Sequence, residues 1–208
     1  MTATARRALV TLVLGLVLLA MVLAGLWYFQ GGSEEVRTGQ VSVGTGGDIG
    51  GGFSLLNQDG QRVTEADFAG DYLLIYFGFT HCVDACPLAL LAMTQALDRL
   101  PPEVAGKIRP LFVTVDPARD DPEQVRLYLE NFHPRFVGLT GTPEEIAAVA
   151  KRYRVVYQAP EADENGDYQV QHGTVIYLMG PEGDFLQNFS HTVEVGRLTE
   201  KLREIVGG

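Results

Sequence analysis

The sequence predicts an α/β sandwich domain preceded by one membrane-spanning helix. Three observations support this fold class. Residues 8–29 form an almost wholly apolar segment near the N-terminus. Residues 72–79 form a continuous apolar run, as is typical of a strand buried on both faces of a sheet, and residues 108–115 are predicted as a second buried strand. Helix-start signals follow these runs, so strands and helices alternate along the chain, as they do in α/β proteins.

The N-terminal apolar segment is long enough to span a bilayer. As a helix rising ~1.5 Å per residue, residues 8–29 reach roughly 33 Å, against a hydrocarbon core of ~30 Å. Arg6 and Arg7 precede the segment, and cationic side chains resist translocation. We therefore expect residues 1–7 on the cytoplasmic side of the inner membrane. The soluble domain is expected on the periplasmic or equivalent outer side.

The alternative for this segment is a cleavable signal peptide. Such peptides have an apolar core of only ~7–15 residues followed by a small-x-small cleavage site. Here the run is longer and ends in Leu26-Trp27-Tyr28-Phe29. These features favour an uncleaved anchor at 8–29, and both alternatives place the domain outside the cytoplasm.

A linker and a single domain follow the predicted anchor. The linker is assigned to residues 30–52, of which 39–52 are rich in Gly, Ser and Thr, as in flexible tethers. The domain is assigned to residues 53–208. Outside the anchor and its two arginines, fourteen basic residues stand against twenty-six acidic ones, a formal charge of −12. A nucleic-acid partner is not expected, because phosphate binding needs clustered cations.

The predicted elements follow a recognisable order. An N-terminal β-hairpin with an Asp59-Gly60 turn comes first. The remaining elements are a strand at 72–79, a helix ending near Leu100 before two prolines, a strand at 108–115, a helix from Asp121, a short strand at 136–139, a helix from Thr142, a strand pair at 174–179 and 184–189, and a last helix at about 194–205. This order matches a thioredoxin-like plan with an N-terminal hairpin extension.

The only two cysteines, Cys82 and Cys86, lie where the strand at 72–79 meets its helix. A disulfide closing so short a loop would stabilise the fold little. Pro87 is tolerated only in the first turn of a helix, so Cys86 should lie at the helix N-terminus. The dipole and free N–H groups there favour a thiolate, and we expect a lowered pKa for this thiol. The pair is thus predicted to be a redox-active dithiol or a pair of soft metal ligands.

The spacing and one histidine favour metal binding over simple dithiol exchange. Thioredoxin-type exchange uses two residues between the cysteines, whereas this chain has three. Two soft sulfurs suit Cu(I) or zinc, and the affinity order favours copper. His172 immediately precedes the strand at 174–179, where thioredoxins carry a cis-proline beside the active-site cysteines. We therefore predict Cys82, Cys86 and His172 as metal ligands. His81, His133 and His191 are not expected to bind the metal.

Several motifs resemble the Sco/SenC family in the same order along the chain. They are FGFTHCVDACP at 77–87, VDPARD at 115–120, FHP at 132–134, FVGLTGT at 136–142, YRV at 153–155 and His172 before its strand. The resemblance covers about residues 50–206. Two positions depart from the family pattern: Val83 stands where proline is common, and Gln171 where aspartate is common. The loss of that carboxylate removes an outer-shell partner for His172.

The resemblance implies an anchored, thioredoxin-like protein that binds copper, as Cu(I) or Cu(II), through Cys82, Cys86 and His172. It further implies a role in assembling the binuclear copper (CuA) site of cytochrome c oxidase. The expected partners are the oxidase subunit that carries this site, other copper chaperones and thioredoxin-like reductants. Asp116 and Asp120, in the VDPARD motif, are expected to cap turns rather than bind copper.

Two further functions remain open. A thiol–disulfide oxidoreductase that reduces the CuA-site cysteines would need Cys82 and Cys86 but not His172. A redox or copper sensor would signal through the anchor without delivering metal. A peroxidase is the weakest alternative, because no supporting arginine stands beside Cys82.

Overall fold

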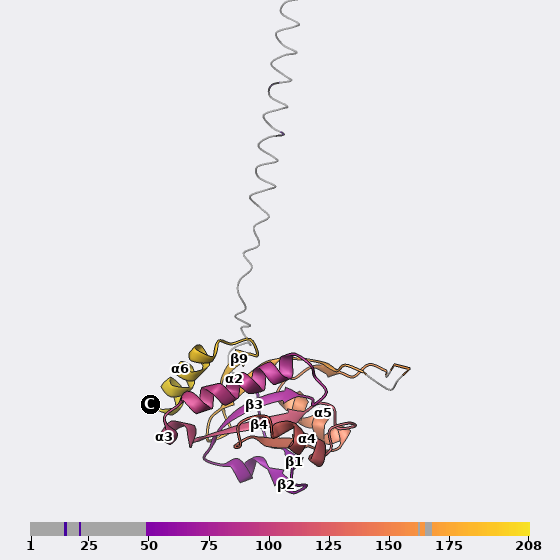
Figure 1. Cartoon of the computed structure of the whole chain (residues 1–208), viewed down its shortest axis with the longest axis horizontal. Helices are drawn as coiled ribbons and strands as arrows, with labels where there is room; N and C mark the ends of the chain where they lie inside the picture. The colour runs from indigo at the N-terminus through magenta and orange to yellow at the C-terminus, as the bar shows by residue number, and fades with distance from the viewer. Residues whose placement is uncertain (1–14, 16–20, 22–48, 162, 165–167) are drawn as a thin grey trace, which may run out of the picture. The chain divides into compact units, whose positions relative to one another are not determined.

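The computed structural model describes residues 15, 21, 49–161, 163–164 and 168–208. The chain divides into two units, Met1–Thr45 and Gly46–Gly208. The elements discussed below all belong to the second unit (Figure 1). In chain order they are β1 (Ser54–Asn57), β2 (Arg62–Thr64), η1 (Glu65–Phe68), β3 (Tyr72–Gly78), α2 (Ala85–Arg99), α3 (Pro102–Ala105), β4 (Ile108–Thr114), α4 (Pro122–Leu129), β5 (Val137–Thr140), α5 (Pro143–Arg152), β6 (Tyr157–Gln158), β7 (Gln171–His172), β8 (Val175–Met179), β9 (Phe185–Ser190) and α6 (Val195–Val206).

A seven-stranded mixed sheet in the order β2-β1-β5-β4-β3-β8-β9 forms the centre of the domain. Strands β3, β4 and β5 are parallel, and the pairs β1–β5, β3–β8 and β8–β9 are antiparallel. The predicted N-terminal hairpin is present as β1–β2, with Gly60 at a φ of 75° in its turn. This arrangement confirms the predicted α/β, thioredoxin-like plan.

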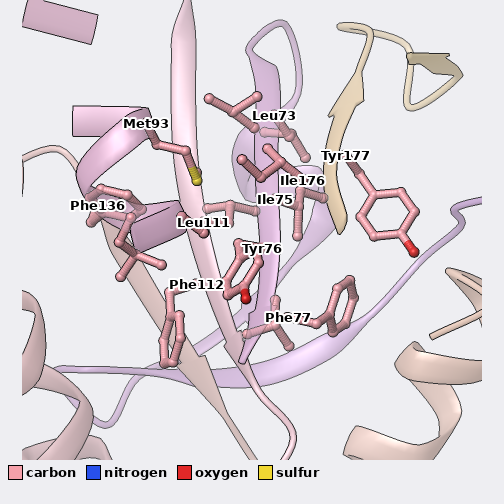
Figure 2. Close-up of a cluster of buried hydrophobic side chains, with 14 of the residues drawn as sticks. Leu73, Ile75, Tyr76, Phe77, Met93, Leu111, Phe112, Phe136, Ile176 and Tyr177 are labelled. Carbon is pink, nitrogen blue, oxygen red and sulfur yellow. The ribbon is translucent and has the colours of Figure 1, made fainter. Parts of the chain in front are cut away.

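Two helical layers cover the sheet because alternate residues of β3 point to opposite faces. Tyr76 and its neighbour Phe112 in β4 lie on one face, where Tyr128 of α4 stacks on Phe112 at 5.5 Å between ring centroids. Phe77 points to the other face and stacks on Tyr153, at the end of α5, at 5.3 Å. Figure 2 shows this division, with Phe77 and Tyr177 on one side of the strands and Phe112 and Met93 on the other. Helices α2 and α6 pack side by side (Figure 1).

Local signals in the sequence set the starts of two helices. Asp121 accepts a hydrogen bond from the backbone N–H of Gln124 at 2.8 Å, and Pro122 is the first residue of α4. Thr142 and Glu145 form a reciprocal capping box at the start of α5. These caps satisfy N–H groups that have no partner within the helix. The predicted helix starts at both positions are therefore confirmed.

Three short elements were not predicted. η1 and α3 are four-residue helices that follow β2 and the end of α2. The third is a separate two-stranded sheet of β6 and β7, which pairs Tyr157 with His172 and Gln158 with Gln171. Two-residue strands carry no alternating pattern, so this ribbon leaves almost no signal in the sequence.

The predicted anchor at 8–29 lies outside the described residues, apart from Gly15 and Met21. Among the residues that the structure describes, no helix has the length and apolar character needed to cross a bilayer. The end of the predicted linker, at 49–52, already contacts the domain. The backbone N–H of Gly50 donates to the carbonyl oxygen of Arg152 at 3.1 Å.

Candidate metal centre

The two cysteines lie at the junction of the central strand β3 and helix α2. Cys82 belongs to the connecting loop, and Cys86 is the second residue of α2, directly before Pro87. Asp84, at the N-cap position, accepts no hydrogen bond through its side chain. Instead the Cys82 sulfur accepts the backbone N–H of Cys86 at 3.4 Å. The sulfur of Cys82 therefore caps the helix, and both thiols are free.

His172 reaches the cysteines from the separate β6–β7 ribbon. Its Nε2 lies 3.5 Å from Sγ of Cys86, and its Nδ1 lies 3.0 Å from the carbonyl oxygen of Gly173. Because the carbonyl can only accept, Nδ1 carries the proton and the Nε2 lone pair faces the thiols. The Gly173 carbonyl therefore serves as the outer-shell partner of His172, in place of the carboxylate that Gln171 does not provide. A bond of this kind fixes the tautomer of a metal-binding histidine.

The three predicted ligands come together in one cluster. Sγ of Cys82, Sγ of Cys86 and a ring nitrogen of His172 all lie within 4.8 Å of one another. In the described part of the chain this is the one cluster of three or more such groups with metal-binding geometry. Two sulfurs and one imidazole nitrogen suit soft or borderline ions, copper and zinc above all.

The two thiols have different environments. Cys86 is fully buried, whereas Cys82 is partly exposed. The hydrogen bond from the Cys86 thiol, with smaller contributions from the backbone N–H groups of Asp84 and Cys86, holds the pKa of Cys82 far below its usual range. The same bond and burial raise the pKa of Cys86. The prediction that Cys86 has the lowered pKa was therefore wrong: the helix N–H groups point at the sulfur of Cys82.

Aromatic rings form the wall behind the histidine. The rings of Phe79 and Tyr76 meet the imidazole of His172 edge-on, with centroids 5.7 Å and 6.1 Å away. Phe79 and Tyr76 are 1% and 0% exposed, so this side of the cluster is closed to water. Burial, with the nearby Cys86 as a lesser cause, raises the pKa of Tyr76. Its phenol therefore remains a hydrogen-bond donor at neutral pH.

Asp120 anchors the loop that carries Cys82. Its carboxylate is 0% exposed and accepts from the backbone N–H and the hydroxyl of Thr80, at 3.0 and 2.6 Å. It also accepts from the hydroxyl of Thr114 at the end of β4, at 2.6 Å. The structural role expected for Asp120 is thus observed.

Asp116 connects the loop after β4 to the β6–β7 segment. One carboxylate oxygen accepts from Nε of Arg119 at 2.6 Å, and the other accepts from the hydroxyl of Tyr168 at 2.7 Å. The Arg119 guanidinium stacks on the Tyr168 ring at 3.6 Å and lies 5.9 Å from the Phe79 ring. Sequence reasoning missed Arg119 and Tyr168. The one available signal was the position of Tyr168, four residues before His172.

The other histidines lie outside the cluster. Nδ1 of His81 is 3.0 Å from the hydroxyl of Thr80. Nδ1 of His133 accepts the backbone N–H of Arg135 at 3.1 Å, which is a turn-stabilising contact. His191 follows β9. That these three histidines do not bind the metal stays a prediction.

The fold and the three donor atoms define a thioredoxin-like protein with a candidate thiolate–imidazole metal centre. The family model described as SCO1/SenC matches residues 42–207. The chain belongs to the Sco/SenC family.

The relatives are similar over most of this chain. The mitochondrial SCO1 homolog 1 of Arabidopsis thaliana is 42% identical over 172 residues, which cover 80% of this chain and 51% of that protein. The mitochondrial SCO1 homolog of Homo sapiens is 43% identical over 155 residues, covering 74% of this chain and 52% of that protein. The chain thus spans about half the length of these curated relatives. The solved structure of Arabidopsis thaliana ScoI with copper bound has a TM-score of 0.70 and 43% identity, covering 77% of this chain and 99% of that one.

Proposed function

We propose that the chain is a membrane-anchored copper metallochaperone that assists assembly of the CuA site of cytochrome c oxidase. In this proposal, Cys82, Cys86 and His172 bind the copper. The observation that carries it is the convergence of two sulfurs and one imidazole nitrogen within 4.8 Å. Family membership supports it, since the similar Arabidopsis thaliana protein has been solved with copper bound.

The chemistry of the cluster favours copper over harder ions. Thiolates select soft Cu(I), and an imidazole nitrogen also suits Cu(II), so three mixed donors accommodate both oxidation states. The Nδ1–H bond of His172 to the Gly173 carbonyl keeps Nε2 free to coordinate. Copper must be accepted and then passed on, and a site open on one side suits such cargo.

The unequal exposure of the sulfurs suggests how copper leaves. An incoming thiol of the acceptor reaches Cys82 first, because Cys86 is fully buried under the start of α2. Exchange would begin by replacing Cys82 while Cys86 and His172 still hold the ion. The proposed acceptor is the oxidase subunit that carries the CuA cysteines. Other copper chaperones are the proposed source of the metal.

A thiol–disulfide oxidoreductase is the second candidate function. The observation that favours it is the pair of free thiols, with a partly exposed Cys82 of lowered pKa beside a buried Cys86. A thiolate of this kind is the nucleophile in dithiol exchange. It would attack a disulfide of the acceptor, and Cys86 would then displace the acceptor thiol and leave a Cys82–Cys86 disulfide. Thioredoxin-like reductants would restore the dithiol.

The anchor and location belong to the same proposal. Residues 8–29 would span the inner membrane once, with 1–7 in the cytoplasm and the domain on the periplasmic or equivalent outer side. The length of the apolar segment and the preceding Arg6 and Arg7 support this topology. Protease added outside spheroplasts should remove the domain and leave a small membrane-bound fragment. A soluble domain released without protease would contradict the anchor.

The three functions are separated by complementing a deletion strain and measuring the CuA content of its oxidase by electron paramagnetic resonance. A metallochaperone predicts that His172→Ala and Cys82→Ala/Cys86→Ala both lose CuA. An oxidoreductase predicts that only the double cysteine variant loses it. Normal CuA in the deletion strain itself would contradict both and favour a sensor. His133→Ala is the matched control, because His133 lies in the same domain but outside the cluster.

A further inference from the structure

Tyr76 places a phenol hydroxyl directly beneath the buried cysteine. The side chain is 0% exposed, and its hydroxyl donates to Sγ of Cys86 at 3.9 Å. Figure 2 shows the ring among the apolar side chains of the central strands, between those of Phe112 and Phe77 in this view. The residue belongs to β3, the strand that leads directly into the cysteine loop.

A hydroxyl at this position has an energetic cost that a phenylalanine would avoid. Burying a hydroxyl without a partner is unfavourable, whereas the neighbouring Phe77 and Phe112 bury only hydrocarbon. In the described part of the chain, the hydrogen-bond acceptor of the Tyr76 hydroxyl is the Cys86 sulfur. The contact with the sulfur is thus what offsets the desolvation of the phenol.

Tight packing keeps the Tyr76 phenol in contact with the Cys86 sulfur. A Cβ added at Gly78 would lie 2.9 Å from Sγ of Cys86 and 2.9 Å from a ring carbon of Tyr76. The absence of a side chain at Gly78 therefore lets the ring and the sulfur approach each other. On its other side the Tyr76 ring meets the edge of His172, at 6.1 Å and an interplanar angle of 78°. Tyr76 touches two of the three proposed ligands.

We propose that Tyr76 is a positioning residue that donates a hydrogen bond to the Cys86 sulfur and thereby favours Cu(I) over Cu(II) at the site. A hydrogen bond to a thiolate withdraws electron density from the sulfur and so weakens its donation to the metal. Cu(II) needs that donation more than Cu(I) does, and hydrogen bonding around a cysteine sulfur is a known means of tuning copper potentials. The inference rests on the proposed copper function and deepens it.

Tyr128 provides a matched control in the same part of the core. Its hydroxyl is also buried, and within the described residues it has no hydrogen-bond partner. It lies on α4 and stacks on Phe112, on the same face of the sheet as Tyr76. Tyr128→Phe therefore removes a buried phenol hydroxyl without removing a hydrogen bond to sulfur.

The test compares full-length wild type, Tyr76→Phe and Tyr128→Phe after loading with Cu(II) and with Cu(I). Tyr76→Phe should move the sulfur-to-Cu(II) charge-transfer band to lower energy and lower the copper reduction potential. The preference for Cu(I) should fall by about fivefold, the effect of losing one typical hydrogen bond. Tyr128→Phe should leave band and potential at wild-type values. Unchanged values in Tyr76→Phe, or equal shifts in both variants, would overturn the proposal.

A metal-free measurement separates this inference from the proposed function. In the reduced protein the Cys86 thiol accepts from Tyr76 while it donates to the Cys82 thiolate, and each hydrogen bond of this chain strengthens the other, whereas the disulfide has no such chain. Loss of the phenol hydroxyl should therefore shift the equilibrium with glutathione toward the Cys82–Cys86 disulfide, by a similar factor, in Tyr76→Phe only. If wild type fails to bind copper, the copper proposal fails, and this equilibrium still tests Tyr76. An unchanged glutathione equilibrium in Tyr76→Phe would overturn the proposed effect of the hydrogen bond from Tyr76 to Cys86.

If Tyr76→Phe does not fold, 3-fluorotyrosine inserted at position 76 replaces it. This residue keeps the hydroxyl and makes it a stronger donor. The charge-transfer band should then move to higher energy and the reduction potential should rise. A fluorinated protein with wild-type spectrum and potential would contradict the proposal.

Discussion

The candidate metal centre joins two regions that are held in very different ways. Cys86 belongs to the first turn of a fifteen-residue helix, which a short loop joins to a strand hydrogen-bonded on both sides, to β4 and β8. His172 belongs to a ribbon in which two residues of β7 pair with two of β6. The cysteine region is thus part of the main sheet, whereas the histidine region is a short ribbon that adds Val155 and Val170 to the core and is otherwise held by polar and aromatic contacts.

The difference suggests that the two thiols and the imidazole contribute differently to copper binding. The thiols are fixed by the sheet and by the helix start, so they set a constant pair of soft ligands. The imidazole is positioned by the Gly173 carbonyl, by the rings of Phe79 and Tyr76, and by the attachment of Tyr168 to Asp116. We expect removal of a sulfur ligand to abolish copper binding. Changes in the histidine region should instead alter which oxidation state is held.

The largest effect should come from removing the buried sulfur. Cys86→Ala leaves one thiol and one imidazole, which is too few soft donors to retain Cu(I) against a competing chelator. The loss of Cu(I) affinity should exceed the roughly 10–100-fold typical of losing an outer-shell partner. Competition with bicinchoninate measures it. Wild-type Cu(I) affinity in this variant would contradict the assignment of Cys86.

The next effect should come from removing the imidazole. His172→Ala keeps both thiolates, which suit Cu(I), and loses the nitrogen donor that Cu(II) favours. We expect Cu(II) affinity to fall by at least about tenfold more than Cu(I) affinity. Parallel titrations of the two ions measure the difference, with His133→Ala as control. Equal losses for the two ions would remove the proposed distinction between the regions.

The pH dependence of alkylation tests the asymmetry within the cysteine region. Because the pKa of Cys82 is lowered, its thiolate persists as the pH falls from 8 to 6, while an ordinary thiol with a pKa of ~8.5 loses most of its reactivity. At pH 6 the metal-free protein should react with iodoacetamide up to about a hundredfold faster than a free cysteine. Cys82→Ala should react slowly, since Cys86 is fully buried and its burial still raises its pKa after the hydrogen bond to Cys82 is lost. Rapid alkylation of Cys86 would contradict the assignment of the lowered pKa to Cys82.

The smallest effect should come from loosening the attachment of the ribbon. Tyr168→Phe removes the hydroxyl that donates to Asp116 at 2.7 Å and leaves the ring stacked on Arg119. We expect Cu(II) affinity to fall by up to about tenfold, at the lower end of the outer-shell range, with Cu(I) affinity nearly unchanged. Tyr177→Phe, a buried tyrosine on the Phe77 face, is the control. An effect confined to Cu(I) would contradict this role for Tyr168.

The cysteine region was largely predictable from sequence because its signals are local. The apolar run at 72–79 predicted β3, and Pro87 placed Cys86 at the start of a helix. The error concerned which sulfur benefits from the helix N–H groups. Sequence position put Cys86 inside the first turn, but the loop folds back so that Sγ of Cys82 receives the N–H of Cys86. That reversal depends on loop geometry, which residue spacing does not specify.

The histidine region was predictable only by analogy with the thioredoxin plan. His172 was placed beside the cysteines because it precedes a strand that starts there, and the structure brings its Nε2 to 3.5 Å from Sγ of Cys86. The ribbon itself, and the contacts among Asp116, Arg119 and Tyr168, were not predicted. These groups lie up to 52 residues apart in sequence, and their association depends on tertiary packing. Binding of copper by the three ligands stays a prediction.

Anaerobic copper titration of the full-length chain, followed by X-ray absorption, tests the central claim most directly. Wild type should bind one copper ion with two sulfur ligands and one nitrogen ligand, and His172→Ala should lose the nitrogen while keeping both sulfurs. A wild-type site without sulfur ligands, or a nitrogen ligand that persists in His172→Ala, would contradict a copper centre built from Cys82, Cys86 and His172.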